Sequence, residues 1–385
     1  AQRYDADGNP VGGEFQVNTH TTGIQTAPFI AVNASGDFVI GWGSRGQDAP
    51  NTYGIYAQRY DASGNTLGGE FQVNTTTSSD QFPGDIAMDA AGNFVITWYG
   101  NGVGDTDGVF YQRFDSAGNP LGSETLVNAT TTDVQGYATI DMDDAGNFVV
   151  VWASENQDGD LGGIYGQRFD AAGNALGGEF LINATTAGDQ KYPELSVNGA
   201  GDFVVVWTHL PASGDAEIRA QRFDASGTAV GAELTAFSGT AIGTSRPSVA
   251  MQDDGGFVLG WDRWAAGNPG IAEVYVQLYD ASGTPDGPVD IRSGTGVVVA
   301  TDSDGNYAAL WQGDSAGDSD GGIVLQRYAT SGLTYAVGDG ADDSTITFTG
   351  TITDINTALE GMTYTPDSGY NGIDTLTITT DDQGN

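Results

Sequence analysis

Short apolar runs that end in tryptophan recur along the chain. Two of them, residues 148–152 (Phe-Val-Val-Val-Trp) and 203–207 (the same five residues), have no polar position at all. A strand without apolar and polar alternation is buried on both faces. The pattern therefore predicts a repeated strand that lies between two layers of protein. Its tryptophans keep a regular spacing, and they are Trp42, Trp98, Trp152, Trp207, Trp261 and Trp311.

A second marker, glutamine and arginine followed by an aromatic residue, keeps the same spacing. Its seven copies begin 49 to 56 residues apart, and one copy has Leu278 in place of arginine. A period of this length indicates a repeat architecture. The copies begin at Gln2, Gln58, Gln112, Gln167, Gln221, Gln277 and Gln326.

One period, residues 85–128, divides into four predicted strands at 86–88, 94–98, 109–114 and 124–128. The segments 89–93 and 115–119 carry Asp, Gly and Asn, which favour hairpin turns. A four-stranded antiparallel sheet with both faces covered, repeated every ~54 residues, is typical of a β-propeller blade. The predicted fold class is therefore all-β.

The chain begins in the middle of a unit and then contains six hairpins of first and second strands, the last at 297–311. This predicts six blades over residues 1–332, with 14–18 as the strand that completes the last sheet. A further hairpin before Ala1 would make seven blades. Residues 333–385 have a different pattern, with strands expected at 345–348 and 375–379 and a helical turn at 354–359. They are predicted to form a small, partial β-sandwich-like module.

The chain carries 51 acidic residues against 12 Lys plus Arg, a formal charge of −39, and no cysteine. Nucleic acid and anionic membranes need clustered cations, so neither is an expected partner. No apolar run reaches the ~18 residues of a membrane span. Most of the acids are aspartates, which suit compact oxygen-rich sites, so calcium ions are the expected partner and cofactor.

The candidate calcium ligands are aspartates in glycine-rich loops and at the end of the chain. Closely spaced carboxylates around glycine can surround Ca²⁺, although none of these loops completes an EF-hand, and a solvated turn is the alternative. The Asp-Gly-Asn hairpins such as 61–65 are predicted to be turns only. The candidate ligands are Asp105, Asp107, Asp158, Asp160, Asp314, Asp318, Asp320, Asp381 and Asp382.

The periodic tryptophans are predicted to be core residues, although their spacing would also suit stacking on sugars in a lectin. Trp264 falls outside the period and is the candidate for an exposed aromatic side chain. The repeated arginine, for example Arg59, is predicted to hold neighbouring blades together by pairing with a carboxylate such as Asp61 or by stacking on an aromatic ring.

The sequence offers few signs of catalysis. It has two histidines, His20 and His209, and neither a Gly-x-Ser-x-Gly nor a His-Glu-x-x-His motif. A glycosidase needs only two carboxylates in one pocket. Such a pocket would require an irregular, blade-specific cluster at the centre of the ring, whereas the acids that stand out follow the repeat. A non-catalytic protein is therefore expected.

The segments 163–174 and 178–183 resemble repeats of giant secreted bacterial adhesins of the calcium-binding RTX type. The segments 337–340, 356–359 and 370–378 are similar to the latter half of their cadherin-like or Ig-like modules. The resemblance implies type I secretion, an extracellular location, calcium-dependent rigidity, and contacts with neighbouring modules or other surface proteins. The expected function is a structural or adhesive module, with a glycan-binding propeller or a glycoside hydrolase as alternatives.

Overall fold

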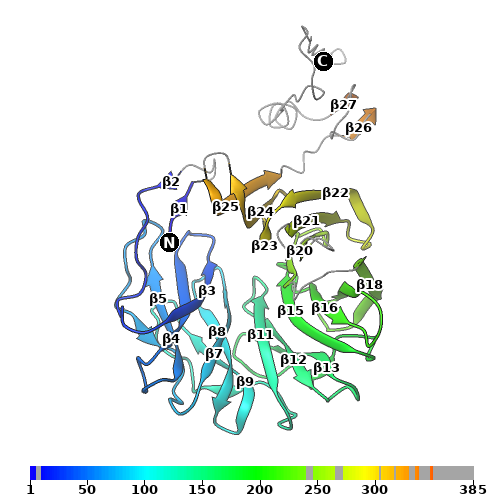
Figure 1. Cartoon of the computed structure of the whole chain (residues 1–385). Coiled ribbons are helices and arrows are strands. Elements are labelled where there is room, and N and C mark those ends of the chain that lie inside the picture. The colour runs from blue at the N-terminus through cyan, green and yellow to red at the C-terminus, as the bar shows by residue number, and fades with distance from the viewer. Residues whose placement is uncertain are drawn as a thin grey trace. The chain divides into compact units, whose positions relative to one another are not determined.

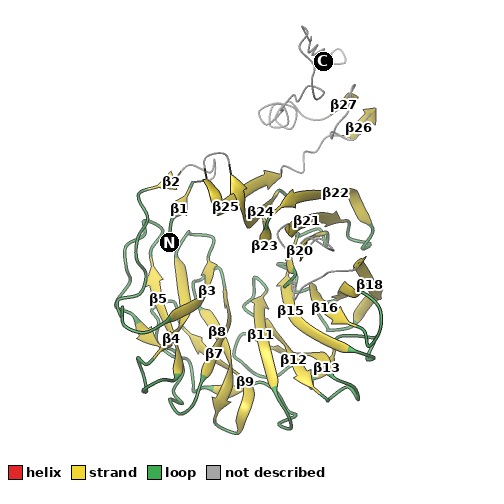
Figure 2. Ribbon diagram, in the orientation of Figure 1, coloured by secondary structure: helices red, strands yellow, loops and turns green. Residues whose placement is uncertain are grey.

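The computed structural model describes residues 1–5, 10–239, 246–264, 272–302, 305–315, 318–328, 334–337 and 347–349. All regular structure in these ranges is β-strand (Figure 2). They contain no helix long and apolar enough to cross a membrane. The chain divides into two compact units, Ala1–Tyr328 and Ala329–Asn385.

The first unit is a six-bladed β-propeller, as predicted (Figure 1). Consecutive strands pair antiparallel within each blade, and the first strand of each blade lies nearest the centre of the ring. The first three blades are β3 (Gln25–Val32), β4 (Phe38–Arg45), β5 (Tyr53–Tyr60) and β6 (Phe71–Gln72); β7 (Gln81–Met88), β8 (Phe94–Gly102), β9 (Asp105–Phe114) and β10 (Thr125–Leu126); β11 (Gln135–Met142), β12 (Phe148–Glu155), β13 (Gly162–Phe169) and β14 (Phe180–Leu181).

The other three blades follow the same order. The sixth contains three strands in the described part of the chain. These blades are β15 (Asp189–Val197), β16 (Phe203–Leu210), β17 (Ala216–Phe223) and β18 (Ala229–Gly239); β19 (Ser248–Met251), β20 (Phe257–Trp264), β21 (Ala272–Tyr279) and β22 (Pro285–Ser293); β23 (Thr295–Thr301), β24 (Tyr307–Ser315) and β25 (Asp318–Tyr328).

In the second to fifth blades, the second strand packs against both neighbouring blades. In β12, Val150 and Trp152 join a core with residues of the second blade. Val149 and Val151, which point to the other face, join a core with Phe203 and other residues of the fourth blade. The six periodic tryptophans are at most 4% exposed, which confirms that they are core residues. The absence of polar positions in these strands is thus explained by burial on both sides.

The repeated Gln-Arg-aromatic marker contributes to the same core. Its aromatic ring stacks on the residue that begins the second strand, as Phe169 does on Phe148 at 4.8 Å between ring centroids. Each following Asp-Gly-Asn hairpin is closed by its own side chains. In 61–65, the Asn65 backbone N–H and Nδ2 donate to the two Asp61 carboxylate oxygens at 2.8 and 2.9 Å. These hydrogen bonds lower the pKa of Asp61 and confirm the turn prediction.

The repeated arginine joins one blade to the next, as predicted, but through different acceptors. Arg113 donates to the carbonyl oxygens of Ala171, at 2.7 Å, and of Ala172 in the third-to-fourth hairpin of the next blade. Arg59 does the same with Ser116 O at 2.7 Å. The predicted carboxylate partner was wrong because Asp61 is already occupied by Asn65, whereas the carbonyls of the neighbouring turn are free to accept.

The N-terminal segment repeats the third-strand pattern but does not supply the predicted closing strand. β1 (Arg3–Tyr4) pairs with β2 (Pro10–Val11), and Arg3 donates to Ser63 O as the other arginines do to their neighbours. Residues 14–18 form no strand. Phe15 and Val17 instead pack against the aromatic core of the first blade, which includes Trp42.

In the second unit the structure describes β26 (Thr334–Val337) and β27 (Thr347–Thr349), which pair antiparallel. The strand expected at 345–348 overlaps β27. The helical turn expected at 354–359 and the strand at 375–379 lie outside the described residues, and the partial β-sandwich-like module over 333–385 stays a prediction.

We expect Arg113→Met to lower the free energy of unfolding by about 1–2 kcal/mol, because two hydrogen bonds from a charged donor are lost at an exposed site. Urea denaturation followed by tryptophan fluorescence would measure it. Arg45→Met is the matched control, since Arg45 lies on a tyrosine ring within its own blade. Equal stability of the two variants would show that the arginine contacts between blades contribute nothing.

Candidate functional site

Three carboxylates lie on first strands at the centre of the ring, where the repeat does not predict them. They are Asp85 on β7, Asp141 on β11 and Glu194 on β15. Thr139 of β11 connects two of them, with its Oγ1 at 3.2 Å from Asp85 Oδ2 and 3.5 Å from Glu194 Oε2. A hydroxyl group donates one proton. Both contacts are therefore satisfied together when Glu194 is protonated and donates to Thr139, while Thr139 donates to Asp85.

Burial raises the pKa of all three carboxyl groups. The pKa of Glu194 is raised to about 8, with the negative charge of Asp85 as the second cause. The pKa of Asp85 is raised to about 6 and that of Asp141 to about 7, both first by burial. Each of the three residues is half-buried. With these pKa values, Glu194 keeps its proton at neutral pH and Asp85 is ionised.

Asp85 and Asp141 also stabilise the ring. Asp141 Oδ2 accepts the backbone N–H of Val197 in the next blade at 2.7 Å. At the register of Asp141 in the next blade, Ser196 accepts the N–H of Met251 at 2.9 Å. At the register of Glu194 in the fifth blade, Ser248 accepts the N–H of Val299 at 3.1 Å. The serines show that a neutral acceptor is sufficient for this structural role. Glu194 has no such backbone contact among the described hydrogen bonds, so its carboxyl group is the one free for chemistry.

A row of aromatic side chains lies along the rim above the carboxylates. Its five members come from the first four blades. Each lies near the end of its blade that carries the loop between the second and third strands. Successive ring centroids are 6.0, 5.5, 5.9 and 4.7 Å apart. At its first end Arg45 stands over a tyrosine and borders a hollow of about 390 Å³. The members of this aromatic rim are Tyr53, Phe82, Tyr99, Tyr137 and Tyr192.

Two of the rim residues have strained backbones. Tyr137 and Tyr192 have φ of 56° and 54°, a left-handed conformation that bulky side chains rarely adopt. Both lie in a β-bulge of the first strand, between Gly136 and Thr139 in β11 and between Lys191 and Glu194 in β15. Such strain costs on the order of 1–3 kcal/mol per residue and is concentrated at functional sites. Each bulge places its tyrosine two residues before the polar residue that it accompanies, Thr139 or Glu194.

The candidate calcium ligands of the second blade are parts of strands. Asp105 and Asp107 lie in β9, because the ladder between β8 and β9 continues through Gly100 and Gly108. Asp105 is 7% exposed, and its carboxylate accepts Asn128 Nδ2 at 2.8 Å and the Asp107 N–H at 3.1 Å. The prediction of a loop at 105–108 was therefore wrong, and the Asp105 carboxylate is used within its own blade.

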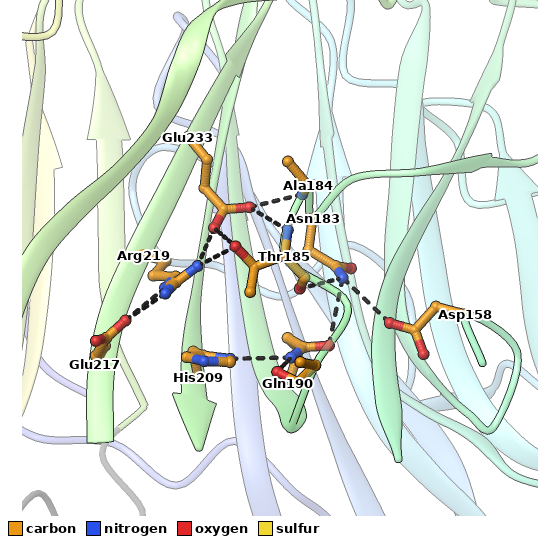
Figure 3. Close-up of polar contacts among 10 residues, drawn as sticks. Asp158, Asn183, Ala184, Thr185, Gln190, His209, Glu217, Arg219 and Glu233 are labelled. Carbon is orange, nitrogen blue, oxygen red and sulfur yellow. Dashed lines mark hydrogen bonds and ion pairs between the residues drawn. The ribbon is translucent and has the colours of Figure 1, made fainter. Parts of the chain in front are cut away.

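Asp158 and Asp160 do lie in a loop, between β12 and β13. Both accept hydrogen bonds from nearby segments of the same polypeptide. Figure 3 shows Asp158 accepting from Nδ2 of Asn183, at 3.3 Å. Asp160 Oδ2 accepts the N–H of Gly188 at 2.8 Å. The same view shows His209, which is buried and lies 2.9 Å from Gln190, so burial lowers its pKa and it does not join the carboxylates.

The side chains of the other candidate ligands lie outside the described part of the chain. Asp314 lies in β24, and Asp318 and Asp320 lie in β25, but their side chains are outside the described part of the chain. Asp381 and Asp382 also lie outside the described residues, as does the side chain of Trp264 at the end of β20. Among the described residues, no group of three or more acidic or histidine side chains could hold a metal ion. Binding of Ca²⁺ stays a prediction that the structure does not test.

The central residues were missed because their signal is a departure from the repeat. Thr139, Glu194 and Ser248 occupy the same register, each paired with the residue that precedes the tryptophan of the second strand. Phe29 holds this place in the first blade and Val298 in the sixth. An alignment of the chain's own repeats at this single position would have separated the polar blades from the apolar ones.

Comparison with known proteins identifies the fold. No protein-family model and no curated protein matches the chain. A protein of unknown function from Dyadobacter fermentans has a TM-score of 0.52 at 12% identity, over 79% of this chain and 94% of that one. An α-L-arabinanase from Penicillium chrysogenum, complexed with arabinobiose, has a TM-score of 0.49 at 11% identity, over 78% and 93%. The α-L-arabinofuranosidase Arb93A from Fusarium graminearum has 0.46 at 11%, over 79% and 92%.

These findings correct the expected kinship with RTX-type adhesins. The solved propellers named above that have a known activity are glycan-cleaving enzymes and not adhesins or cadherin-like modules. The adhesive function rested on that resemblance, and the non-catalytic assignment rested on the lack of catalytic motifs; both are corrected by these findings, whereas calcium binding is not tested by them. The physical reason is local, because a blade-specific carboxylate cluster lies at the centre of the ring, which is the feature that the sequence argument required of a glycosidase.

We expect Glu194→Gln to stabilise the protein at about pH 9 but not at about pH 5. A pKa raised from 4.5 to about 8 means that the folded state binds the proton more tightly. This contribution to stability is complete below about pH 4 and is lost as the pH rises through 8. Thermal melting of the variant and the parent protein at both pH values would measure it. The exposed Glu155→Gln at the end of β12 should change neither curve, and equal effects at both pH values would contradict the assigned burial.

Proposed function

We propose that this chain is a glycoside hydrolase that binds a glycan along the aromatic rim and cleaves it at the central carboxylates. The observation that carries the proposal is the pair Asp85 and Glu194, which come from different blades and contact one Thr139 hydroxyl. A pair of carboxyl groups with different pKa values is what glycosidic cleavage requires. Aromatic side chains at the rim supply the faces on which sugar rings stack.

The geometry supports one assignment of roles. Glu194, whose pKa is the higher, is the general acid and donates its proton to the glycosidic oxygen as the bond from that oxygen to the anomeric carbon breaks. Asp85 is ionised at neutral pH and stabilises the positive charge that develops on the sugar. Water supplies the hydroxyl group of the new reducing end, and its second proton returns to the carboxylate pair. The atoms and charges therefore balance without a redox partner.

Asp141 is a positioning residue in this mechanism. Its carboxylate accepts the N–H groups of Met142 at 2.8 Å and Val197 at 2.7 Å, which fixes β11 against β15 and so fixes Thr139 against Glu194. The proposal also keeps the expected extracellular location, because a polymeric glycan does not cross a membrane and is reached by an enzyme outside the cell.

Binding of a glycan without cleavage is the second candidate function, favoured by the aromatic rim alone.

We expect Glu194→Gln and Asp85→Asn to reduce glycan cleavage at least 100-fold while the protein stays folded, since each variant removes one of the two proton-transfer or charge-stabilising groups. Release of reducing ends from a panel of neutral and acidic polysaccharides would detect the activity. Glu155→Gln, which makes the same substitution at an exposed position, is the control. If the parent protein binds a polysaccharide but cleaves none, the glycan-binding function replaces this one.

We expect Phe82→Ala to weaken glycan binding about 3- to 10-fold, which corresponds to about 0.5–1.5 kcal/mol for one aromatic contact. Phe82 is 39% exposed and lies between Tyr53 and Tyr99 in the rim. Calorimetry in the Glu194→Gln background would measure binding without turnover. Val103→Ala, which removes a 76% exposed side chain outside the rim, should bind as the parent does.

A further inference from the structure

Cationic side chains are scarce in this protein, and most of those described hold the fold together. The whole chain has 12 Lys plus Arg. One group of arginines donates to backbone carbonyls of the next blade. Two more form ion pairs with glutamates, Arg219 with Glu217 and Arg263 with Glu273. The members of the first group are Arg3, Arg59, Arg113 and Arg222.

Arg246 is used differently. It is exposed, and its guanidinium carbon lies 5.7 Å from the ring centroid of Tyr137 and 5.1 Å from that of Tyr192. Among the described residues, no carboxylate forms an ion pair with it. A guanidinium group held over aromatic faces keeps its N–H donors for another acceptor. Arg246 is therefore a cation fixed on the rim with its hydrogen-bonding capacity available.

The charge of Arg246 lies close to the carboxylates. It is strong enough at Glu194 to oppose part of the rise in the pKa of that group. Lys191, the only lysine of the chain, begins the bulge that carries Tyr192, and it pairs with Asp189 at 2.6 Å. The two cations thus lie around the same two tyrosines. Since the ion pair with Asp189 occupies Lys191, Arg246 is the cation of this pair that stays available to an anionic ligand.

From this placement we infer that the rim binds an acidic glycan, and that Arg246 recognises the carboxylate of a sugar unit next to the cleavage site. The inference rests on the proposed function and names its substrate class. The planar fork of a guanidinium group matches a carboxylate in a bidentate pair, which a neutral sugar cannot offer. A neutral glycan would need the tyrosine faces themselves, and Arg246 covers two of them.

The surrounding negative charge favours selectivity over general attraction. Screening limits the field of the other acids to about 8–10 Å at physiological salt, so only a carboxylate that reaches Arg246 gains an attraction. A bound carboxylate would also offset the effect of Arg246 on Glu194. The proton of Glu194 would then be held more firmly in the complex than in the free protein, which is the state that a general acid requires.

The test uses matched polymers and matched variants of the whole chain, in the Glu194→Gln background. The probes are polygalacturonate, polymannuronate and hyaluronan, each beside its carboxyl-reduced form, which keeps the linkages and loses the charge. Calorimetry would measure binding of each polymer to Arg246→Met, to Arg246→Lys and to Arg113→Met. Arg113 is the control because it is bound to the third-to-fourth hairpin of the next blade and lies outside the rim.

We expect at least one polyuronate to bind about 10-fold or more tightly than its reduced form. Arg246→Met should abolish that difference, Arg246→Lys should keep part of it, and Arg113→Met should keep it all. Equal binding of a polyuronate and its reduced form would overturn the inference and leave the proposed function standing. Binding of neither form, together with no cleavage of any polysaccharide, would overturn the proposed function itself.

Discussion

The burial of both faces of the second strands in the second to fifth blades is the constraint on which the rest of this structure depends. In β12, alternate residues enter two different cores, one shared with the second blade and one with the fourth. A polar residue in such a strand needs a hydrogen-bond partner, as Thr97 of β8 has in the N–H of Asp85 at 3.0 Å. The same pentapeptide pattern therefore recurs from blade to blade, and this repeat makes the fold recognisable in the sequence.

The first strands are under a weaker constraint, and the site occupies them. At one register of these strands, Phe, Thr, Glu, Ser and Val occur in different blades. Five of the six first strands carry a bulge beside this register, and in β11 and β15 the bulge contains a tyrosine with a left-handed backbone. A rigid, repetitive outer body thus supports an irregular centre.

This division explains what could be predicted from the sequence. The four-stranded unit, the propeller, the buried tryptophans and the Asp-Asn turns follow from chemistry that is repeated, and the structure confirms them. The site follows from Asp85, Thr139 and Glu194. Each of these residues is specific to one blade, and nothing in the neighbouring sequence distinguishes it. The closely spaced aspartates suggested calcium sites. The carboxylates of Asp105 and Asp158 instead accept hydrogen bonds from Asn128 and Asn183, which follow the fourth strands of their blades.

Leu278 marks a junction of a different kind in the ring. In other blades an arginine at this position donates hydrogen bonds to the hairpin of the next blade. In the fifth blade, Leu278 packs against the apolar core that this blade shares with the sixth. Apolar contacts weaken on cooling, whereas hydrogen bonds from a guanidinium group do not depend on that effect. We therefore expect this one contact to respond to low temperature differently from its counterparts, so that the sixth blade is the part of the circle most sensitive to cold.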